Sequence, residues 1–273
     1  MTFNLCFISG PWRACLWSAG LLVIAHLSIN YPQAAPISNS KNLAAVPVSR
    51  LDQPWWNTRF HEKEVELHRG PVQLLWLGDS ITQNWELNGP QQWQEFAPVW
   101  QKFYGDRHAI NLGFKGDSTC HLLWRLQNGE LKNIEPKVAI VLIGANNFGH
   151  IHTDAKMTEA GIQAVLDEIH KQTPQTRVLL LSVLPSIRSM WVSQNTDHLN
   201  AALEKSMRAR SYVTYMDVSK LFLQEGRVEQ NKFLDPFLTP PAPPLHPTAQ
   251  AQEQLAALIE PTLARLLGDQ IHH

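Results

Sequence analysis

The chain has 273 residues, 44% of them hydrophobic, which is enough for one globular domain with a substantial core. Its formal net charge of -1 gives no electrostatic reason to bind nucleic acid or an anionic membrane surface, so we expect neither partner. The sequence contains no internal repeat and no low-complexity segment.

The N-terminal residues differ from the rest of the chain. Arg13 precedes an apolar stretch at residues 14–29, and small residues with two prolines follow at 32–36. This order is typical of a secretory signal. We therefore predict that residues 1–35 are a signal peptide and that the protein is periplasmic or secreted. Left uncleaved, the same stretch would be an N-terminal membrane anchor, and the chain would meet a membrane only there.

Residues 36–52 are rich in proline, serine and asparagine, and we predict that they form a linker to a domain at 53–273. Because Cys6 and Cys15 fall in the N-terminal stretch, Cys120 is the single cysteine of that domain, and no internal disulfide is expected. Cys120 stands in an apolar stretch, which favours a buried small hydrophobic residue over a nucleophile.

Apolar runs alternate with helical patterns along the domain. The runs lie at residues 72–77, 108–112, 138–143, 178–183 and 213–216. Strands that are apolar throughout and separated by helices indicate a parallel sheet covered on both faces, which is a doubly wound α/β fold.

Polar motifs follow the first three of these runs. The first run ends in Gly78-Asp79-Ser80, the second leads into NLGFKGDS at 111–118, and the third leads into GANN at 144–147. The carboxyl ends of parallel strands share one edge of a sheet, so these loops are expected to converge on one crevice. The α/β-hydrolase fold, the competing architecture for a serine esterase, is disfavoured because its Gly-x-Ser-x-Gly turn would need a glycine where Thr82 stands.

With LHPT at 245–248 as the fourth motif, the sequence resembles the SGNH/GDSL hydrolase family. It is most similar to the branch that contains the catalytic subunits of intracellular platelet-activating-factor acetylhydrolase and bacterial relatives, and residues 123–138 also follow that branch. The resemblance covers roughly residues 55–267. It implies a flavodoxin-like, three-layer α/β/α sandwich with a five-stranded parallel sheet, and ester hydrolysis without a cofactor.

The resemblance also implies roles for particular residues. Ser80 would be the nucleophile and His246 the base, since a free serine hydroxyl is a poor nucleophile at neutral pH. The backbone N–H groups of Ser80 and Gly116, with the side-chain amide of Asn146, would form the oxyanion hole.

Other polar residues receive structural interpretations. Asp79 and Asp117 are predicted to brace their loops as hydrogen-bond acceptors. His150 and His152 have no cysteine or acidic partner at metal-ligand spacing beside them, so we expect them to line the mouth of the cleft, and we expect no metal site.

One catalytic position departs from the family pattern. The family has an aspartate three residues before the histidine, where this chain has Pro243. A backbone carbonyl could hold the imidazole of His246, Asp235 or another acid of the 226–244 loop could replace the aspartate, or the enzyme could be slow or inactive. We expect the backbone carbonyl, because the prolines around His246 could fix its loop.

These observations together predict an exported serine esterase that acts through an acyl-serine intermediate. Its substrate would carry short acyl groups, acetyl foremost, on a carbohydrate or a similar ester, because export without a lipid-binding signal favours a polysaccharide over a phospholipid. Two alternatives stay open. One is an acyltransferase with the same Ser-His pair, and the other is a non-catalytic binding or assembly protein on a degenerate hydrolase scaffold.

Overall fold

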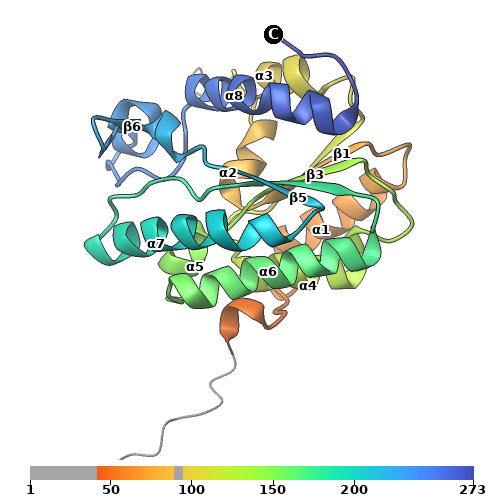
Figure 1. Ribbon diagram of the computed structural model, residues 1–273, viewed down its shortest axis with the longest axis horizontal. Helices are drawn as coiled ribbons and strands as arrows, with labels where there is room; N and C mark the ends of the chain where they lie inside the picture. The colour runs from red at the N-terminus through yellow and green to blue at the C-terminus, as the bar shows by residue number, and fades with distance from the viewer. Residues whose placement is uncertain (1–41, 89–94) are drawn as a thin grey trace, which may run out of the picture. The chain divides into compact units, whose positions relative to one another are not determined.

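A five-stranded parallel sheet forms the centre of the protein, in a computed structural model that describes residues 42–88 and 95–273 (Figure 1). The strands are β1 (Leu74–Gly78), β2 (Ala109–Gly113), β3 (Val138–Leu142), β4 (Arg177–Leu181) and β5 (Val213–Met216). Each strand overlaps one of the predicted apolar runs, and their order across the sheet is β2-β1-β3-β4-β5. This is the flavodoxin-like order, so the predicted fold class is confirmed.

Helices cover both faces of the sheet and give three layers (Figure 1). One face carries α1 (Pro54–Leu67), α4 (Thr119–Arg125), α5 (Ala145–Gly149), α6 (Ala155–Gln172) and α7 (Met190–Ser206). The other face carries α2 (Ser80–Gln83), α3 (Phe96–Tyr104) and α8 (Ala249–Leu267). Short elements complete the described chain: η1 (Leu43–Ala45), η2 (Asn84–Glu86), η3 (Leu126–Glu130), η4 (Met207–Ala209), η5 (Ser219–Phe222), β6 (Leu223–Gln224), β7 (Arg227–Val228), η6 (Gln230–Lys232) and η7 (Asp235–Phe237).

The register of the central strands sets the level at which the functional loops leave the sheet. Strands β1 and β3 are buried along their whole length, as continuous apolar runs between two helical layers require. Gly78 at the end of β1 pairs with Gly113 on one side and with Leu142 on the other. The loops that follow β1, β2 and β3 therefore begin side by side, as the sequence predicted.

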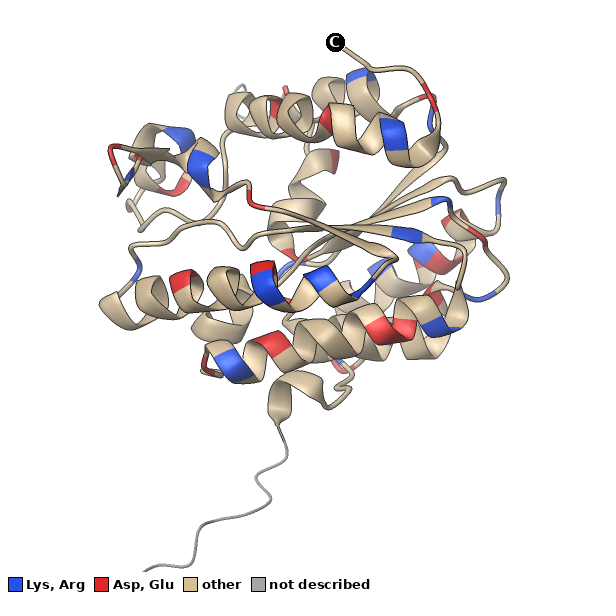
Figure 2. Cartoon of the chain, viewed as in Figure 1, with Lys and Arg blue, Asp and Glu red and all other residues tan. Residues whose placement is uncertain are grey.

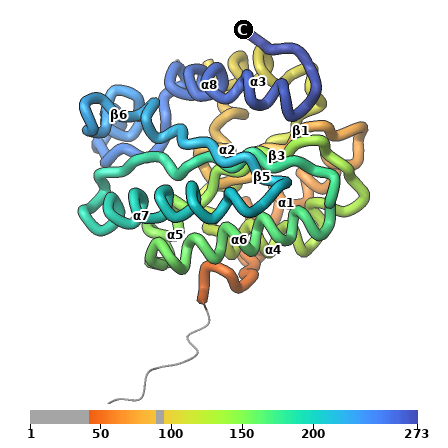
Figure 3. Tube along the Cα trace, in the orientation of Figure 1, coloured from red at the N-terminus to blue at the C-terminus, as the bar shows by residue number. Residues whose placement is uncertain are grey.

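The predicted linker is wrong over residues 42–52. We call residues 42–53 the N-terminal arm; it packs against α4 and α6 (Figure 3). Ala44 is fully buried, and its carbonyl oxygen accepts a hydrogen bond of 2.7 Å from Thr119 Oγ1. Gly161 in α6 makes room for the arm, because a Cβ there would lie 2.6 Å from the Ala44 oxygen. The compact unit accordingly includes residues 42–52 instead of beginning at residue 53.

The predicted signal peptide or anchor at 1–35 and the first residues of the predicted linker lie outside the described residues. Within 42–88 and 95–273, no helix combines the length and the apolar character needed to cross a membrane. Basic and acidic residues are interspersed along the helices and loops of this part (Figure 2).

Candidate active site

The Gly-Asp-Ser motif places Ser80 at the end of a buried strand. Gly78 is the last residue of β1, and a Cβ there would lie 2.4 Å from the carbonyl oxygen of Leu142 on β3. Asp79 caps the next helix, because its Oδ1 accepts a 2.9 Å hydrogen bond from the N–H of Ile81. Ser80 is then the first residue of α2, at the carboxyl edge of the sheet. Each residue type is thus explained by the turn that presents the serine.

Ser80, His246 and Asp235 form a continuous hydrogen-bonded chain. Ser80 Oγ lies 2.9 Å from His246 Nε2. On the other side of the ring, His246 Nδ1 lies 2.7 Å from Asp235 Oδ1. The expectation that a backbone carbonyl holds the imidazole is therefore wrong, and the second alternative, Asp235, occupies that place. A carboxylate forms a stronger, charge-assisted hydrogen bond with the ring than a carbonyl could.

An antiparallel pairing brings Asp235 to His246 across 11 positions of sequence. Phe233 forms a bridge with Pro247, and the N–H of Leu234 donates to the His246 carbonyl oxygen at 2.7 Å. The pairing puts the carboxylate beside the histidine without any acid three residues before it. Pro243, which stands at the family's aspartate position, is exposed.

The Asp235 carboxylate also holds the backbone of the histidine loop. Its Oδ2 accepts hydrogen bonds from the N–H groups of Leu245, at 2.7 Å, and His246, at 2.6 Å. Burial by itself would raise the pKa of this carboxyl, but the hydrogen bonds from His246 and Leu245 outweigh burial and lower the pKa below its ordinary value. Asp235 is therefore an ionised carboxylate at neutral pH and can accept the hydrogen bond from the imidazole of His246.

Asp79 has the opposite electrostatic character. It is 1% exposed, and burial raises the pKa of its carboxyl from 3.8 to about 6, against the lowering effects of its bond to Ile81 and of His246. It acts as a cap for the nucleophile's helix, in agreement with the predicted bracing role.

The three groups assigned to the oxyanion hole lie around one cleft. Ser80, Gly116 and Asn146 all line a cleft of about 600 Å³ together with His246. Gly116 has a φ of +76°, a conformation that favours glycine. Asn146 Nδ2 donates to the carbonyl oxygen of Asp117 at 3.0 Å. Because an amide nitrogen carries two hydrogens, Asn146 can brace this loop and donate into the cleft at the same time.

The rest of the cleft wall is partly apolar and partly polar. Its apolar lining comes from leucines: Leu87, Leu234, Leu238 and Leu245. Lys115 and His150 add polar groups, and the position of His150 agrees with its predicted place at the cleft.

Over residues 42–88 and 95–273, no group of three or more metal-ligating side chains is present. Cys120 is 2% exposed, and burial raises the pKa of its thiol to about 11, so it packs as a small hydrophobic residue.

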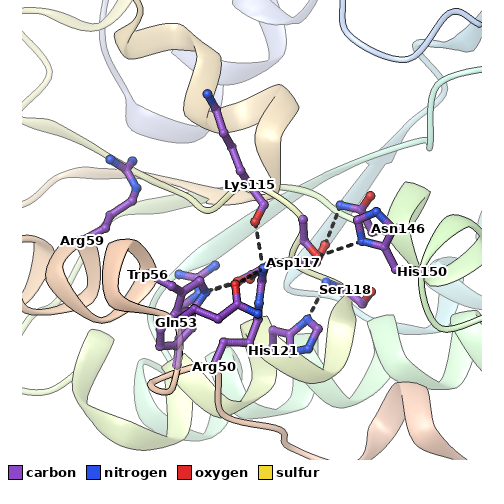
Figure 4. Close-up of polar contacts among 12 residues, drawn as sticks. Arg50, Gln53, Trp56, Arg59, Lys115, Asp117, Ser118, His121, Asn146 and His150 are labelled. Carbon is purple, nitrogen blue, oxygen red and sulfur yellow. Dashed lines mark hydrogen bonds and ion pairs between the residues drawn. The ribbon is translucent and has the colours of Figure 1, made fainter. Parts of the chain in front are cut away.

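A buried ionic cluster behind the cleft was not predicted. The fully buried Asp117 carboxylate accepts hydrogen bonds from Arg50 Nη1 at 2.8 Å and from Trp56 Nε1 at 2.9 Å (Figure 4). It accepts a third from Arg125 Nε at 2.9 Å. Sequence reasoning assigned Asp117 to loop bracing but did not find its partners. Arg125 could have been noticed, because it is a charged residue among leucines. Arg50 gave no such sign, because it lies within the predicted linker.

Comparison with known proteins shows the family to which the chain belongs. A family model described as the GDSL-like lipase/acylhydrolase family matches residues 76–254. The chain belongs to this family. Platelet-activating factor acetylhydrolase IB subunit alpha1 from Bos taurus is 32% identical to it over 180 residues, which are 65% of this chain and 68% of the bovine protein.

Solved structures of GDSL proteins and esterases share the fold. A GDSL-like lipase from Bacteroides thetaiotaomicron superposes with a TM-score of 0.60 at 18% identity, covering 76% of this chain and 97% of the lipase. A carbohydrate esterase family 3 protein from Talaromyces cellulolyticus superposes with a TM-score of 0.54 at 16% identity, covering 73% and 99%. As a member of the GDSL family, the protein is a hydrolase of the acylhydrolase and esterase type.

Proposed function

We propose that this GDSL hydrolase is an exported serine esterase that removes short acyl groups, acetyl foremost, from an O-acylated carbohydrate or a similar ester. The observation that carries the proposal is the hydrogen-bonded chain from Ser80 Oγ through His246 to Asp235, with distances of 2.9 and 2.7 Å. This is the arrangement that activates a serine for attack on an ester.

The reaction would proceed in two halves at one serine. As Ser80 Oγ bonds to the ester carbonyl carbon, His246 Nε2 accepts the hydroxyl proton. When the tetrahedral intermediate collapses, the bond to the alcohol oxygen breaks and the proton on Nε2 passes to the leaving alcohol. Water, deprotonated by the same nitrogen, then attacks the acyl-serine carbonyl carbon. The bond from that carbon to Ser80 Oγ breaks, the proton on Nε2 returns to the serine oxygen, and the acid is released. Asp235 accepts the Nδ1–H throughout, so Nε2 is the nitrogen that takes and returns the proton in each half.

The oxyanion of each intermediate would form beside the N–H groups of Ser80 and Gly116 and the amide of Asn146. Donors placed before the reaction are most effective where charge develops in the transition state. Their place on the wall that also holds His246 supports this assignment.

The substrate class rests on several weaker supports. The leucines of the cleft suit an acyl group, and its polar members suit a hydroxylated alcohol. The Talaromyces structural neighbour is described as a carbohydrate esterase. Export, inferred from residues 1–35, would give the enzyme access to extracellular or envelope polysaccharides.

The two alternatives differ in their standing. The argument for a non-catalytic scaffold was that Pro243 replaces the family's aspartate. That argument no longer applies, because the Asp235 carboxylate lies beside His246. An acyltransferase would use the same acyl-serine but pass the acyl group to a sugar hydroxyl instead of water. Counting released acid against acylated acceptor, with an O-acetylated oligosaccharide as donor, separates these two fates.

Labelling by a serine-directed fluorophosphonate tests the proposal. We expect a single label at Ser80, hydrolysis of an acetyl ester, and loss of both in Ser80→Ala with little change in melting temperature. The chain offers a matched control in its second Gly-Asp-Ser tripeptide, whose Ser118 is fully buried at the start of α4. Ser118→Ala should keep the label. A wild-type protein that is neither labelled nor active would contradict the proposal.

A further inference from the structure

The peptide between Lys115 and Gly116 is held from behind by Arg50. Arg50 Nη1 donates a 2.9 Å hydrogen bond to the Lys115 carbonyl oxygen. This peptide bond is trans, since the cis bond of the described chain is Thr239-Pro240. In a planar trans peptide the carbonyl oxygen and the following N–H point in opposite directions. A guanidinium fixed on the Lys115 oxygen therefore directs the Gly116 N–H away from itself.

The Arg50 guanidinium forms a second hydrogen bond with the 115–117 loop. Arg50 Nη1 also bonds to Asp117 Oδ1 at 2.8 Å, one residue beyond Gly116 (Figure 4). Arg50 is itself held in place, because its Nη2 donates to Gln53 Oε1 at 2.8 Å and its guanidinium carbon lies 5.3 Å from the ring centre of Trp55. Both flanks of Gly116 are thus bonded to one rigid, planar cation.

Gly116 itself lies against that cation. A Cβ added to Gly116 would be 3.3 Å from Arg50 Nη1 and 3.4 Å from Nη2. With a φ of +76°, the residue already has a conformation that the surrounding contacts must maintain. Removing the guanidinium would leave the loop free to relax at its glycine.

From these contacts we infer that Arg50 is a positioning residue for the oxyanion hole. It sets the orientation of the 115–116 peptide, and its charge on the carbonyl oxygen polarises that peptide, which makes the Gly116 N–H a stronger donor. The Arg50 side chain is 15% exposed, so water screens this charge only in part. The inference rests on the proposed esterase function, because it assigns Gly116 N–H to the oxyanion.

The arm that carries Arg50 gains a role from this inference. Arg50 lies before residues 76–254, the part of the chain that the GDSL family model matches. It belongs to the N-terminal arm, which docks on α4 and α6 through the buried Ala44. The arm would therefore complete the active site from outside the matched region.

Kinetics of Arg50 variants test the inference. Arg50→Met keeps the aliphatic stem but removes the charge and the donors. We expect kcat for an acetyl ester to fall about 10- to 100-fold while KM changes less than about threefold, since an oxyanion donor acts in the transition state. The affinity for a boronic acid, which forms a tetrahedral adduct on Ser80, should fall by the same factor as kcat. If Arg50 were needed only for folding, the loss of kcat and the loss of affinity for the boronic acid would not be equal.

Arg59 provides a matched control. Its side chain is 13% exposed, and it also bonds to a main-chain oxygen, that of Gly113 at 2.8 Å, and to a carboxylate, that of Glu86 at 2.8 Å. The 113–114 peptide supplies no oxyanion donor, so Arg59→Met should leave kcat within about threefold. An equal loss of kcat in both variants would overturn the inference.

A second substitution keeps the test decisive if Arg50→Met does not fold. Arg50→Lys retains the positive charge but replaces the planar guanidinium with a single ammonium group. Its kcat should therefore fall by a smaller factor than that of Arg50→Met, with KM again almost unchanged. Unchanged kcat in Arg50→Lys, or a loss confined to KM, would overturn the role of Arg50. If wild-type protein hydrolyses no ester and takes no label at Ser80, the proposed function itself has failed and this inference falls with it.

Discussion

The Asp235 carboxylate serves two groups of one loop. One oxygen faces the imidazole of His246, and the other accepts the N–H groups of Leu245 and His246. The residue therefore selects the ring tautomer and fixes the backbone from which the ring projects. A backbone carbonyl, which we expected from the sequence, has one oxygen and could not satisfy both demands.

We predict that Asp235→Asn lowers kcat for a short-chain ester by about 10⁴-fold, as removal of the orienting carboxylate does in a serine protease. An amide presents one oxygen and one NH₂ group, so it cannot accept from both the ring and the two backbone N–H groups. Steady-state kinetics measure the change. Asp217→Asn, on the exposed loop after β5, is the control and should stay within about twofold. A loss below about tenfold in Asp235→Asn would remove the carboxylate from the mechanism.

The buried Asp79 predicts a pH dependence of stability. Burial raises the pKa of its carboxyl to about 6 in the folded protein, against an ordinary value of 3.8. Between these values the folded state binds more protons than the unfolded state, so this group's contribution falls as pH rises from about 4 to 6. Asp79→Asn should therefore become more stable relative to wild type as pH rises, by at most about 3 kcal/mol for a shift of this size.

Urea unfolding of both proteins at pH 4.5, 5.5 and 7 measures that difference. The substituted amide keeps an oxygen that can accept from the Ile81 N–H, so the helix cap is preserved. Asp235, whose pKa is lowered, contributes stability that is lost only as pH falls below about 3.8, outside this window. If the free energies of unfolding of wild type and Asp79→Asn differ by the same amount at all three pH values, Asp79 is not the source of the pH dependence of stability.

At the scale of elements, the strands were predictable and the histidine loop was not. Each buried strand is an apolar run, and burial on both faces leaves a pattern that the sequence shows directly. The bridge between Phe233 and Pro247 leaves no such pattern, because it pairs single residues across an irregular loop. Sequence spacing therefore pointed to Pro243, whereas the fold uses Asp235.

Pro243→Asp tests that interpretation. We expect kcat to change by less than about twofold, because Pro243 is exposed and His246 Nδ1 already faces Asp235. Pro243→Ala separates the loss of a rigid residue from the gain of a carboxylate. A rise of tenfold or more in Pro243→Asp alone would mean that the native carboxylate is poorly placed and that the family position is the better one.

The N-terminal arm shows the same limit of sequence reasoning at a larger scale. Pro47 and Ser49 of the arm belong to the composition that predicted a linker at 36–52, and composition does not show that Ala44 fits against a glycine of another helix. Gly161 was the available sign, since glycine inside a helical pattern often marks close packing. Docking of the arm depends on such a match between distant residues, which one sequence alone does not display.

At the scale of the whole molecule, the arm decides how much of the chain the enzyme needs. If export removes residues 1–35, the mature protein still contains the whole arm, with Ala44 against α6 and Arg50 bonded to Lys115 and Asp117. We predict that a chain beginning at Lys41 keeps the melting temperature and kcat of the longer protein, because it retains the whole arm and the rest of the compact unit.

A chain beginning at Pro54 should lose both properties. It lacks the buried Ala44, the hydrogen bond from Thr119, and the bonds from Arg50 to Lys115 and Asp117. Leaving the Asp117 carboxylate buried with one cationic partner fewer is costly in itself, so we expect a lower melting temperature as well as a lower kcat. Thermal unfolding and ester hydrolysis of the two chains measure these effects side by side. If the chain from Pro54 matches the chain from Lys41 in both measurements, the docked arm contributes neither to the stability of the domain nor to its kcat.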